Sequence, residues 1–176
     1  MTTMAATDLK RYIRDIPDFP KPGILFRDIT PLLQNGPMLR AVIDQLADRY
    51  ASQRVEAVVA VESRGLIFGA PLAYRLGTGL IPVRKAGKLP AKTIRATYTL
   101  EYGEGTLEVH ADSLSSGKRV LLVDDLLATG GTMGAVVQLM DHFRAHVVEV
   151  AFLVELSALE GRSRLGKHSV FSLVQY

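Results

Sequence analysis

Two adjacent carboxylates, Asp124 and Asp125, follow the apolar residues 120–123, and a run of small residues leads from them to Thr132. This order predicts a buried strand, two acids at its end, and a glycine turn that opens a helix. The first N–H groups of a helix lack backbone partners and lie at the positive end of the helix dipole, so such a turn is suited to bind a phosphate. Glycine also lets the backbone approach the anion closely. The residues of the turn are Ala128, Thr129, Gly130, Gly131 and Thr132.

The two aspartates require a different ligand, because carboxylates repel a phosphate group. Carboxylates accept hydrogen bonds, and the two vicinal hydroxyls of a ribose supply matching donors. The segment therefore predicts a site for a 5-phosphorylated ribose, with the phosphate in the turn and the diol on the acids. Common nucleotide-binding motifs do not match, since the sequence has neither a Walker lysine after these glycines nor the G-x-G-x-x-G spacing. An ordinary strand–helix turn with two solvated aspartates is the alternative.

Basic residues follow two further apolar runs, at residues 57–61 and 80–83, and they alternate with Gly65 and Gly87. Arginine can bind phosphate oxygens through two parallel hydrogen bonds, whereas lysine acts as a point charge. These residues are suited to bind a strongly anionic group, and a solvated basic face is the alternative. The cations are Arg64, Arg84, Lys85 and Lys88.

Strand-like and helix-like periods alternate along the chain. Strands are expected at residues 55–61, 80–83, 120–123 and 147–156, and helices at residues 7–16, 37–51, 66–76 and 132–144. This alternation predicts an α/β fold with an open, mostly parallel twisted sheet flanked by helices. Ligands of such sheets bind beyond the carboxyl ends of the strands, so the loops at residues 62–65, 84–88 and 124–132 are expected to converge there.

The length of 176 residues and the hydrophobic content of 48% predict a single domain, residues 1–176, with a core of ordinary size. The absence of cysteine excludes disulfides, thiolate metal sites and cysteine nucleophiles. A net charge of only +3 does not indicate a nucleic-acid partner. The first ten residues lack the apolar core of a signal peptide, and no apolar run approaches the roughly 18 residues of a membrane span. We therefore expect a cytoplasmic protein with no nucleic-acid and no membrane partner.

Five further blocks occur in order along the chain: residues 17–20 (PDFP), 26–31 (FRDITP), 62–65 (ESRG), 84–90 (RKAGKLP) and 100–103 (LEYG). Each block alone is weak, but the set extends over nearly the whole chain. The segment 120–132 resembles the phosphoribosyl pyrophosphate (PRPP) motif of the type I phosphoribosyltransferases. Together the blocks resemble the adenine phosphoribosyltransferases within that family.

This resemblance implies transfer of the 5-phosphoribosyl group from PRPP to adenine, giving AMP and pyrophosphate in purine salvage. It implies an oxocarbenium-like transition state. Mg²⁺ is the implied cofactor, held mostly by substrate oxygens and water rather than by a dedicated set of protein ligands. A homodimer is also implied, in which residues near the loop 84–88 reach the neighbouring subunit.

The resemblance also implies a role for each matching residue. PRPP and AMP are expected to contact Asp124, Asp125, Ala128, Thr129, Gly130, Gly131 and Thr132. Pyrophosphate is expected to contact Glu62, Ser63, Arg64, Gly65, Arg84, Lys85 and Lys88. Backbone strain concentrates at such sites, but the sequence does not show whether the turn 62–65 contains a non-proline cis peptide. Adenine is expected to contact Leu25, Phe26, Arg27 and Leu159. Glu101 is the candidate that handles the proton of adenine, and Tyr102 is expected to donate to pyrophosphate or to seal the site.

A small hood over adenine, from about residues 1–35 and 156–170, and a mobile lid at about residues 93–108 complete the implied site. Closure of the lid would exclude water. The residues by themselves also fit other structures. Leu25 and Phe26 suit the core of a short strand, and Glu101 and Tyr102 suit an exposed hairpin. The arginine-rich segment 159–165 receives no functional role.

Two other functions are compatible with the same motifs. A related enzyme could use a 6-oxopurine, but that base needs a donor, commonly a lysine, and none stands within residues 25–27 or near Leu159. This favours adenine. The second is a non-catalytic, PRPP-sensing regulator of the same fold, which usually carries an additional nucleic-acid-binding module for which this chain has little room.

Overall fold

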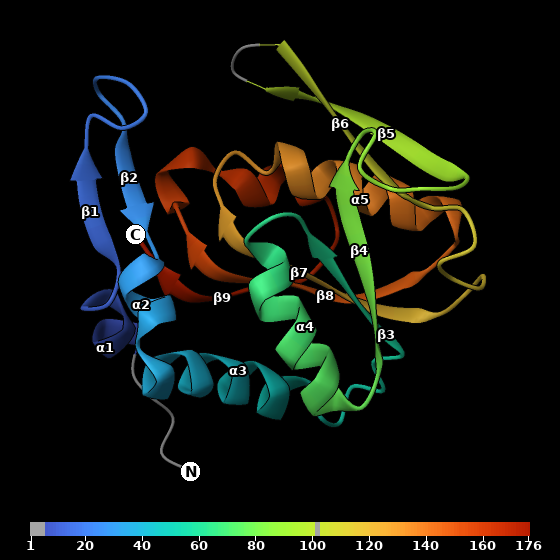
Figure 1. Ribbon diagram of the computed structural model, residues 1–176, viewed down its shortest axis with the longest axis horizontal. Helices are drawn as coiled ribbons and strands as arrows, with labels where there is room; N and C mark the ends of the chain where they lie inside the picture. The colour runs from blue at the N-terminus through green and yellow to red at the C-terminus, as the bar shows by residue number, and fades with distance from the viewer. Residues whose placement is uncertain (1–5, 101–102) are drawn as a thin grey trace.

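The computed structural model describes residues 6–100 and 103–176, and its centre is a seven-stranded sheet in the order β5-β6-β4-β3-β7-β8-β9 (Figure 1). The strands are β3 (Ala57–Val61), β4 (Gly79–Lys85), β5 (Thr93–Leu100), β6 (Gly103–His110), β7 (Arg119–Leu127), β8 (His146–Glu155) and β9 (Val170–Gln175). Strands β4, β3, β7, β8 and β9 run parallel, whereas β6 is antiparallel to both β4 and β5. The predicted α/β fold with a mostly parallel sheet is confirmed.

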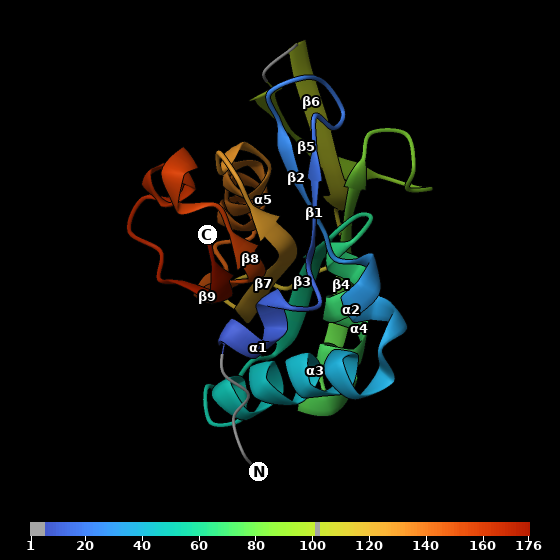
Figure 2. The same cartoon turned by 90° about the vertical axis from the view of Figure 1, so that its left-hand side faces the viewer.

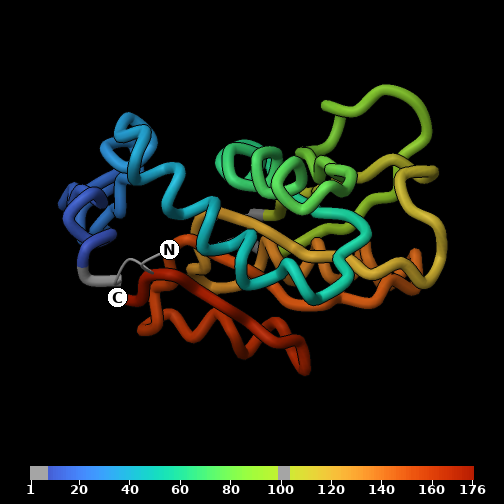
Figure 3. Tube along the Cα trace, turned by 90° about the horizontal axis from the view of Figure 1, so that it is seen from below, coloured from blue at the N-terminus to red at the C-terminus, as the bar shows by residue number. Residues whose placement is uncertain are grey.

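Helices cover both faces of this sheet. α3 (Gly36–Tyr50) and α4 (Gly65–Leu76) pack on one face, which is the near face when the molecule is seen from below (Figure 3), and α5 (Gly131–His142) packs on the other. In β7, Val120 and Leu122 point to the α5 side, while Leu121 and Val123 point to the α3 and α4 side. All four side chains are buried, which explains why the strand is a continuous apolar run.

The N-terminal segment corrects the prediction of a helix over residues 7–16. α1 (Ala6–Lys10) ends early, and β1 (Arg14–Pro17) pairs antiparallel with β2 (Leu25–Asp28) before α2 (Thr30–Gln34) begins. Leu9 and Ile13 are buried, so the apolar spacing identifies core residues correctly. Pairing with β2, however, decides the backbone conformation after residue 13. The β1–β2 sheet and the β5–β6 hairpin rise at the same end of the molecule in both views (Figures 1 and 2).

Two segments differ from their predicted bounds because of their strand partners. Strand β7 continues to Leu127, where it still pairs with Glu155 of β8, so Asp124 and Asp125 belong to the strand rather than following it. The segment expected to form a lid is the antiparallel hairpin of β5 and β6, which extends to His110. No helix within the described residues is long and apolar enough to cross a membrane.

The C-terminal segment adds an edge strand that the sequence did not indicate. Strand β9 pairs in parallel with β8. Before it, the segment that includes the arginine-rich residues 159–165 consists of two short 3₁₀ turns, η1 (Ser157–Leu159) and η2 (Gly161–Leu165). Arg162 donates from Nε and Nη2 to the two carboxylate oxygens of Glu155, at 2.6 Å each, and from Nη1 to the Val170 carbonyl at 3.0 Å. The arginine therefore fastens η2 to the ends of β8 and β9.

Candidate functional site

One pocket of about 530 Å³ lies beyond the carboxyl ends of β3 and β7, beside the first turn of α5. The loops that follow β3 and β7 converge on it, as does the end of β4. The predicted site residues that line it are Glu62, Ser63, Arg64, Lys85, Asp124, Asp125, Ala128, Thr129, Gly130, Gly131 and Thr132. Apolar and aromatic side chains complete the walls: Val61, Tyr98, Leu107, Leu126, Leu127, Met133 and Phe152.

The turn between β7 and α5 is held tightly from behind. Gly130 caps α5 with a φ of +80°, a left-handed conformation that favours glycine. A Cβ at Gly130 would overlap the carbonyl oxygen of Gly161, and a Cβ at Gly161 would overlap the carbonyl oxygen of Ala128. The turn and η2 are thus packed backbone against backbone. The N–H groups of the first turn of α5 border the pocket, an arrangement suited to an anion.

The two aspartates on β7 share one positive partner. Asp125 is only 5% exposed, and its Oδ2 accepts a hydrogen bond from Arg64 Nε at 2.5 Å. Its backbone N–H donates to Asp124 Oδ1 at 2.8 Å. Burial raises the pKa of Asp124 well above its usual value, and the neighbouring charge of Asp125 raises it further. The pair therefore offers acceptor oxygens to a ligand and is compensated on one side by the Arg64 guanidinium.

The loop after β3 fits closely against the end of β7. A Cβ at Gly65 would overlap Oδ1 of Asp124 and crowd the backbone of β7, so only glycine fits at the start of α4. The peptide bond between Glu62 and Ser63 is cis, which the sequence alone does not show. Glu62 itself is anchored at its backbone, where its N–H donates to the Val83 carbonyl at 2.9 Å.

The Glu62 carboxylate binds groups of β4 rather than facing open solvent. Its Oε2 accepts from Arg84 Nε at 2.7 Å and its Oε1 from the Lys85 N–H at 2.7 Å. Burial alone would raise the pKa of Glu62, but the Lys85 N–H and the Arg84 guanidinium together bring it below its usual value. Arg84 also donates to the Lys88 carbonyl at 3.0 Å. Lys85 lines the pocket, whereas Arg84 and Lys88 are not among its lining residues.

The residues expected to contact adenine lie on β2 and η1, next to the pocket rather than in its lining. The Phe26 ring is 5.7 Å from the Arg64 guanidinium and stacks edge-on against Phe19 at 5.1 Å. Leu25 is 45% exposed, so it is not the core residue that a short strand could have required, and Leu159 is 47% exposed. Arg64 therefore binds Asp125 in the pocket and lies beside the Phe26 ring of β2.

Arg27, the third of these β2 residues, points to the C-terminus. It pairs with Asp15 of β1, and its guanidinium lies 3.8 Å from the ring centroid of Tyr176. Lys10 lies 4.5 Å from the same ring. The last residue of the chain therefore fixes β2 from one side, a contact that no motif in the sequence indicates.

Tyr98 is a pocket residue that sequence reasoning missed. It lies opposite Gly105 in the β5–β6 hairpin, and a Cβ at Gly105 would overlap the Tyr98 ring. A glycine opposite an aromatic residue is a sequence pattern that could have indicated this packing. The expected catalytic residues Glu101 and Tyr102 lie outside the described residues, between the two strands of this hairpin.

Comparison with known proteins gives consistent matches over almost the full length. Residues 28–175 match the phosphoribosyl transferase domain family. The chain is 58% identical to the adenine phosphoribosyltransferase of Carboxydothermus hydrogenoformans, with 96% of this chain and 99% of that protein covered. Its structure is similar to that of the adenine phosphoribosyltransferase of Thermoanaerobacter pseudethanolicus, with a TM-score of 0.94, 46% identity and coverage of 98% of this chain and 100% of that one.

A second similar structure was solved with ligands. The adenine phosphoribosyltransferase of Saccharomyces cerevisiae, complexed with D-2,5-dideoxy-2,5-imino-altritol 1,6-bisphosphate and adenine, matches with a TM-score of 0.91 and 39% identity. The match covers 96% of this chain and 98% of that chain.

Proposed function

Because this chain belongs to the adenine phosphoribosyltransferase family, we propose that the pocket beyond β3 and β7 is where it joins adenine to the phosphoribosyl group of PRPP. The reaction transfers the 5-phosphoribosyl group of PRPP to adenine and yields AMP and pyrophosphate, a step of purine salvage. Relatives of 53–58% identity share the name of the adenine enzyme, which favours adenine over a 6-oxopurine and an enzyme over a PRPP-sensing regulator.

One observation carries the assignment of the pocket: the turn 128–132 and the carboxylates of Asp124 and Asp125 face the same space. We propose that the N–H groups of the turn, with the hydroxyls of Thr129 and Thr132, bind the 5-phosphate. The aspartates then accept hydrogen bonds from the ribose hydroxyls. Their negative charge also stabilises the cationic, oxocarbenium-like ribosyl group of the transition state.

The pyrophosphate of PRPP is assigned to the side of the pocket formed by the loop 62–65 and Lys85. Arg64 and Lys85 line the pocket and supply positive charge to the departing group. Arg84 and Lys88 add positive charge near this side, and Arg84 neutralises Glu62, which would otherwise repel the anion. Ser63 and Gly65 bring the backbone close to the diphosphate.

The residues of the pocket are compatible with Mg²⁺ as a cofactor that binds together with PRPP. No cluster of three or more potential metal ligands occurs among the residues that the structure describes, but Asp124 and Asp125 line the pocket beside each other. One or two carboxylates combined with substrate phosphates and water is the usual environment of this ion. Asp124 is the better placed to hold it, since Asp125 already pairs with Arg64. When bound, Mg²⁺ neutralises part of the diphosphate charge.

Adenine is assigned to the space between the pocket and the hood. In the structure, the hood segments include β1, β2 and the 3₁₀ turns η1 and η2. Phe26 and Leu159 supply apolar surface for the ring faces, and the backbone of Leu25 and Arg27 supplies hydrogen bonds to its edge. The position of Phe26 beside Arg64 supports this placement, because it puts the base next to the sugar site.

The lid residues complete the proposed mechanism. Glu101 takes the proton that adenine loses as the glycosidic bond forms, and Tyr102 binds pyrophosphate or seals the site. Residues 93–108 close over the bound substrates and exclude the water that would hydrolyse PRPP. Tyr98, which lines the pocket from β5, supports a role of this hairpin in forming the site wall.

A homodimer is proposed through the exposed apolar surface of α4 and β4. Tyr74 is 85% exposed, and Ile67, seven residues earlier on the same helix, is also exposed. Leu80 of β4 is exposed too. Exposed large apolar side chains on neighbouring elements favour a protein interface. Residues 84–88 comprise the last two residues of β4 and the start of the loop that follows it.

A direct assay tests the function. The purified protein is incubated with PRPP, Mg²⁺ and one of adenine, hypoxanthine or guanine, and nucleotide and pyrophosphate are quantified. The proposal expects AMP and pyrophosphate in equal amounts with adenine and a rate at least a hundredfold lower with either 6-oxopurine. Equal rates with hypoxanthine, or binding of PRPP with no turnover, would contradict it.

A further inference from the structure

Glu108 on β6 is a buried carboxylate that the mechanism above does not use. It is 1% exposed, and a buried charge is expected only where several partners stabilise it. Its Oε1 accepts three backbone hydrogen bonds, and its Oε2 accepts two from side chains. The Oε1 donors are the N–H groups of Gly87 at 2.9 Å, Lys88 at 3.1 Å and Leu89 at 3.0 Å. The Oε2 donors are Thr93 at 3.3 Å and Arg95 at 3.2 Å.

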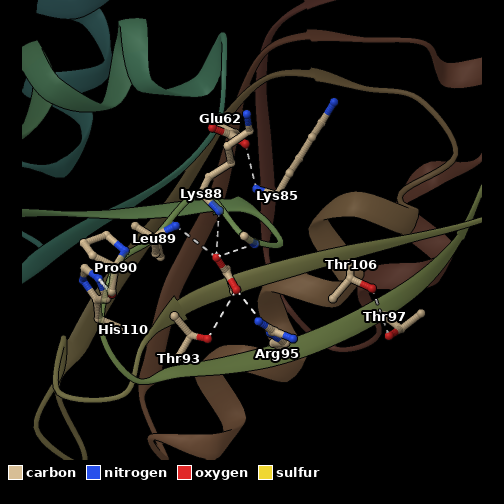
Figure 4. A network of polar contacts seen from close by, with 12 residues as sticks. Glu62, Lys85, Lys88, Leu89, Pro90, Thr93, Arg95, Thr97, Thr106 and His110 are labelled. Carbon is tan, nitrogen blue, oxygen red and sulfur yellow. Dashed lines mark hydrogen bonds and ion pairs between the residues drawn. The ribbon is translucent and has the colours of Figure 1, made fainter.

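The three backbone donors belong to the loop between β4 and β5. Gly87 has a φ of +82°, which turns the chain so that consecutive N–H groups point to one centre. In Figure 4 the dashed lines from Lys88, Leu89, Thr93 and Arg95 converge on a single carboxylate. These backbone bonds, with burial as an opposing effect, hold the pKa of Glu108 below its usual value, so the group is ionised at neutral pH.

The loop held by Glu108 contains Lys88 and begins directly after Lys85, the last residue of β4, which lines the pocket. The side chains of Lys85 and Lys88 extend to the side on which Glu62 lies (Figure 4). The Lys88 carbonyl accepts from Arg84, whose Nε binds Glu62. A continuous path of hydrogen bonds thus joins Glu108 to the loop after β3.

We propose that Glu108 is a positioning residue that fixes the loop 86–90 so that Lys85 and Lys88 face the pyrophosphate side of the pocket before PRPP binds. It acts from the base of the β5–β6 hairpin and does not itself line the pocket. The inference rests on the proposed function, because it assigns these lysines to pyrophosphate. Pre-organised cations lower the cost of ordering the loop when an anion binds.

The test distinguishes the hydrogen bonds of Oε1 of Glu108 from those of Oε2. Glu108→Leu removes all five hydrogen bonds, and Glu108→Gln keeps a neutral carbonyl that holds the three N–H groups less strongly. Arg95→Leu is the matched control, because it removes a partner of Oε2 and leaves the three backbone bonds in place. Amide hydrogen exchange of Gly87, Lys88 and Leu89 is measured without ligand, and KM is measured for PRPP and for adenine.

The expected result is graded. Glu108→Leu raises the exchange rates of the three amides and the KM for PRPP at least tenfold, with the KM for adenine within about twofold of wild type. Glu108→Gln gives smaller changes in the same direction, and Arg95→Leu gives none. The proposal would be overturned if Glu108→Leu kept the wild-type exchange rates and the wild-type KM for PRPP. It would also be overturned if Arg95→Leu raised both quantities as much as Glu108→Leu does.

If Glu108→Leu does not fold, Glu108→Gln and Arg95→Leu decide the question between them. Faster exchange of the loop in Glu108→Gln alone supports the proposal, and equal exchange in both overturns it. The exchange measurement needs no substrate. A wild-type protein that made no AMP would therefore contradict the proposed function without altering what exchange says about the loop.

Discussion

Arg64 connects the parts of the site at the level of single residues. Its guanidinium binds Asp125 at 2.5 Å, lies 5.7 Å from the Phe26 ring and borders the pocket, although its side chain is 46% exposed. A cation in this position holds the ribose-binding acid while remaining accessible to an anionic ligand. Substitution of Asp125 should therefore change the affinity for PRPP more than the free energy of unfolding.

Asp125→Asn tests the ribose assignment. Replacing a carboxylate acceptor with a neutral amide weakens charge-assisted hydrogen bonds of about 1.5–3 kcal/mol, which corresponds to roughly a 10- to 100-fold loss in kcat/KM for PRPP. The fold should persist, because the side chain keeps its shape. Steady-state kinetics with PRPP varied is the measurement. Asp48→Asn, at an exposed position of α3 that contributes nothing to the pocket, is the control. Wild-type kinetics in Asp125→Asn would remove this residue from the site.

A pH experiment tests the junction between β2 and α2. Hydrogen bonds from the Thr30 side chain and N–H, and then the Arg14 guanidinium, lower the pKa of Asp28 to about 2. Because the folded-state value lies below the ordinary value of 3.8, ionised Asp28 stabilises the fold above about pH 4, and this contribution is lost as the pH falls towards 2. Asp28→Asn should cost about 1–2 kcal/mol at pH 7 and much less at pH 2.5. Urea unfolding at both pH values measures this, and an equal loss at both would contradict it.

The geometry of the turn between β7 and α5 depends on its packing against η2. Its backbone touches that of η2, which Arg162 holds against Glu155. The arginine-rich segment, which has no role by sequence alone, therefore supports the proposed phosphate site from behind. A side chain at the contact between the two elements should disturb both stability and phosphate binding.

Gly130→Ala tests this contact. It places a residue at a φ of +80° and forces a Cβ against the Gly161 carbonyl, which should cost about 1–3 kcal/mol and weaken binding of AMP. Gly134→Ala, one turn later in α5, meets only an ordinary contact at 3.7 Å and should stabilise the helix by about 0.5–1 kcal/mol. Thermal unfolding with and without AMP compares the two. The idea fails if both variants behave alike.

Patterns in the sequence predict the type of most elements around the site better than they predict the first and last residues of those elements. The apolar run at residues 120–123 correctly identifies a strand, but the strand continues through Asp124 and Asp125 because β8 pairs with it up to Glu155. Residues 7–16 have a helical spacing of apolar positions, yet residues 14–17 form β1 because β2 lies alongside. Both errors arise from long-range pairing, which local patterns do not contain.

At the scale of the whole molecule, strand–helix alternation predicts the sheet and the edge at which ligands bind. The pocket lies at that edge. The sequence did not indicate β9, or the contact of Tyr176 with Arg27 through which the end of the chain steadies the hood. These features depend on residues far apart in the sequence. The positions of Leu25, Phe26 and Leu159 next to the site were expected only from a family resemblance, since their residue types alone suit a core.

Tyr74→Glu tests the proposed dimer. A charge on the exposed apolar face of α4 that carries Ile67 and Tyr74 should prevent association without unfolding the monomer, because Tyr74 is 85% exposed. Sedimentation at several concentrations should give a dimer for wild type and a monomer for the variant. Lys167→Glu, an exposed charge change outside these elements, controls for charge alone. A dimer that survives Tyr74→Glu would place the interface elsewhere.

The most direct test of the whole account is a crystal structure of this protein with AMP. We predict the 5′-phosphate on the backbone N–H groups of residues 128–132, the two ribose hydroxyls on Asp124 and Asp125, and the adenine ring beside Phe26. A phosphate bound elsewhere, with the turn 128–132 free of ligand, would contradict the site from which every assignment here proceeds.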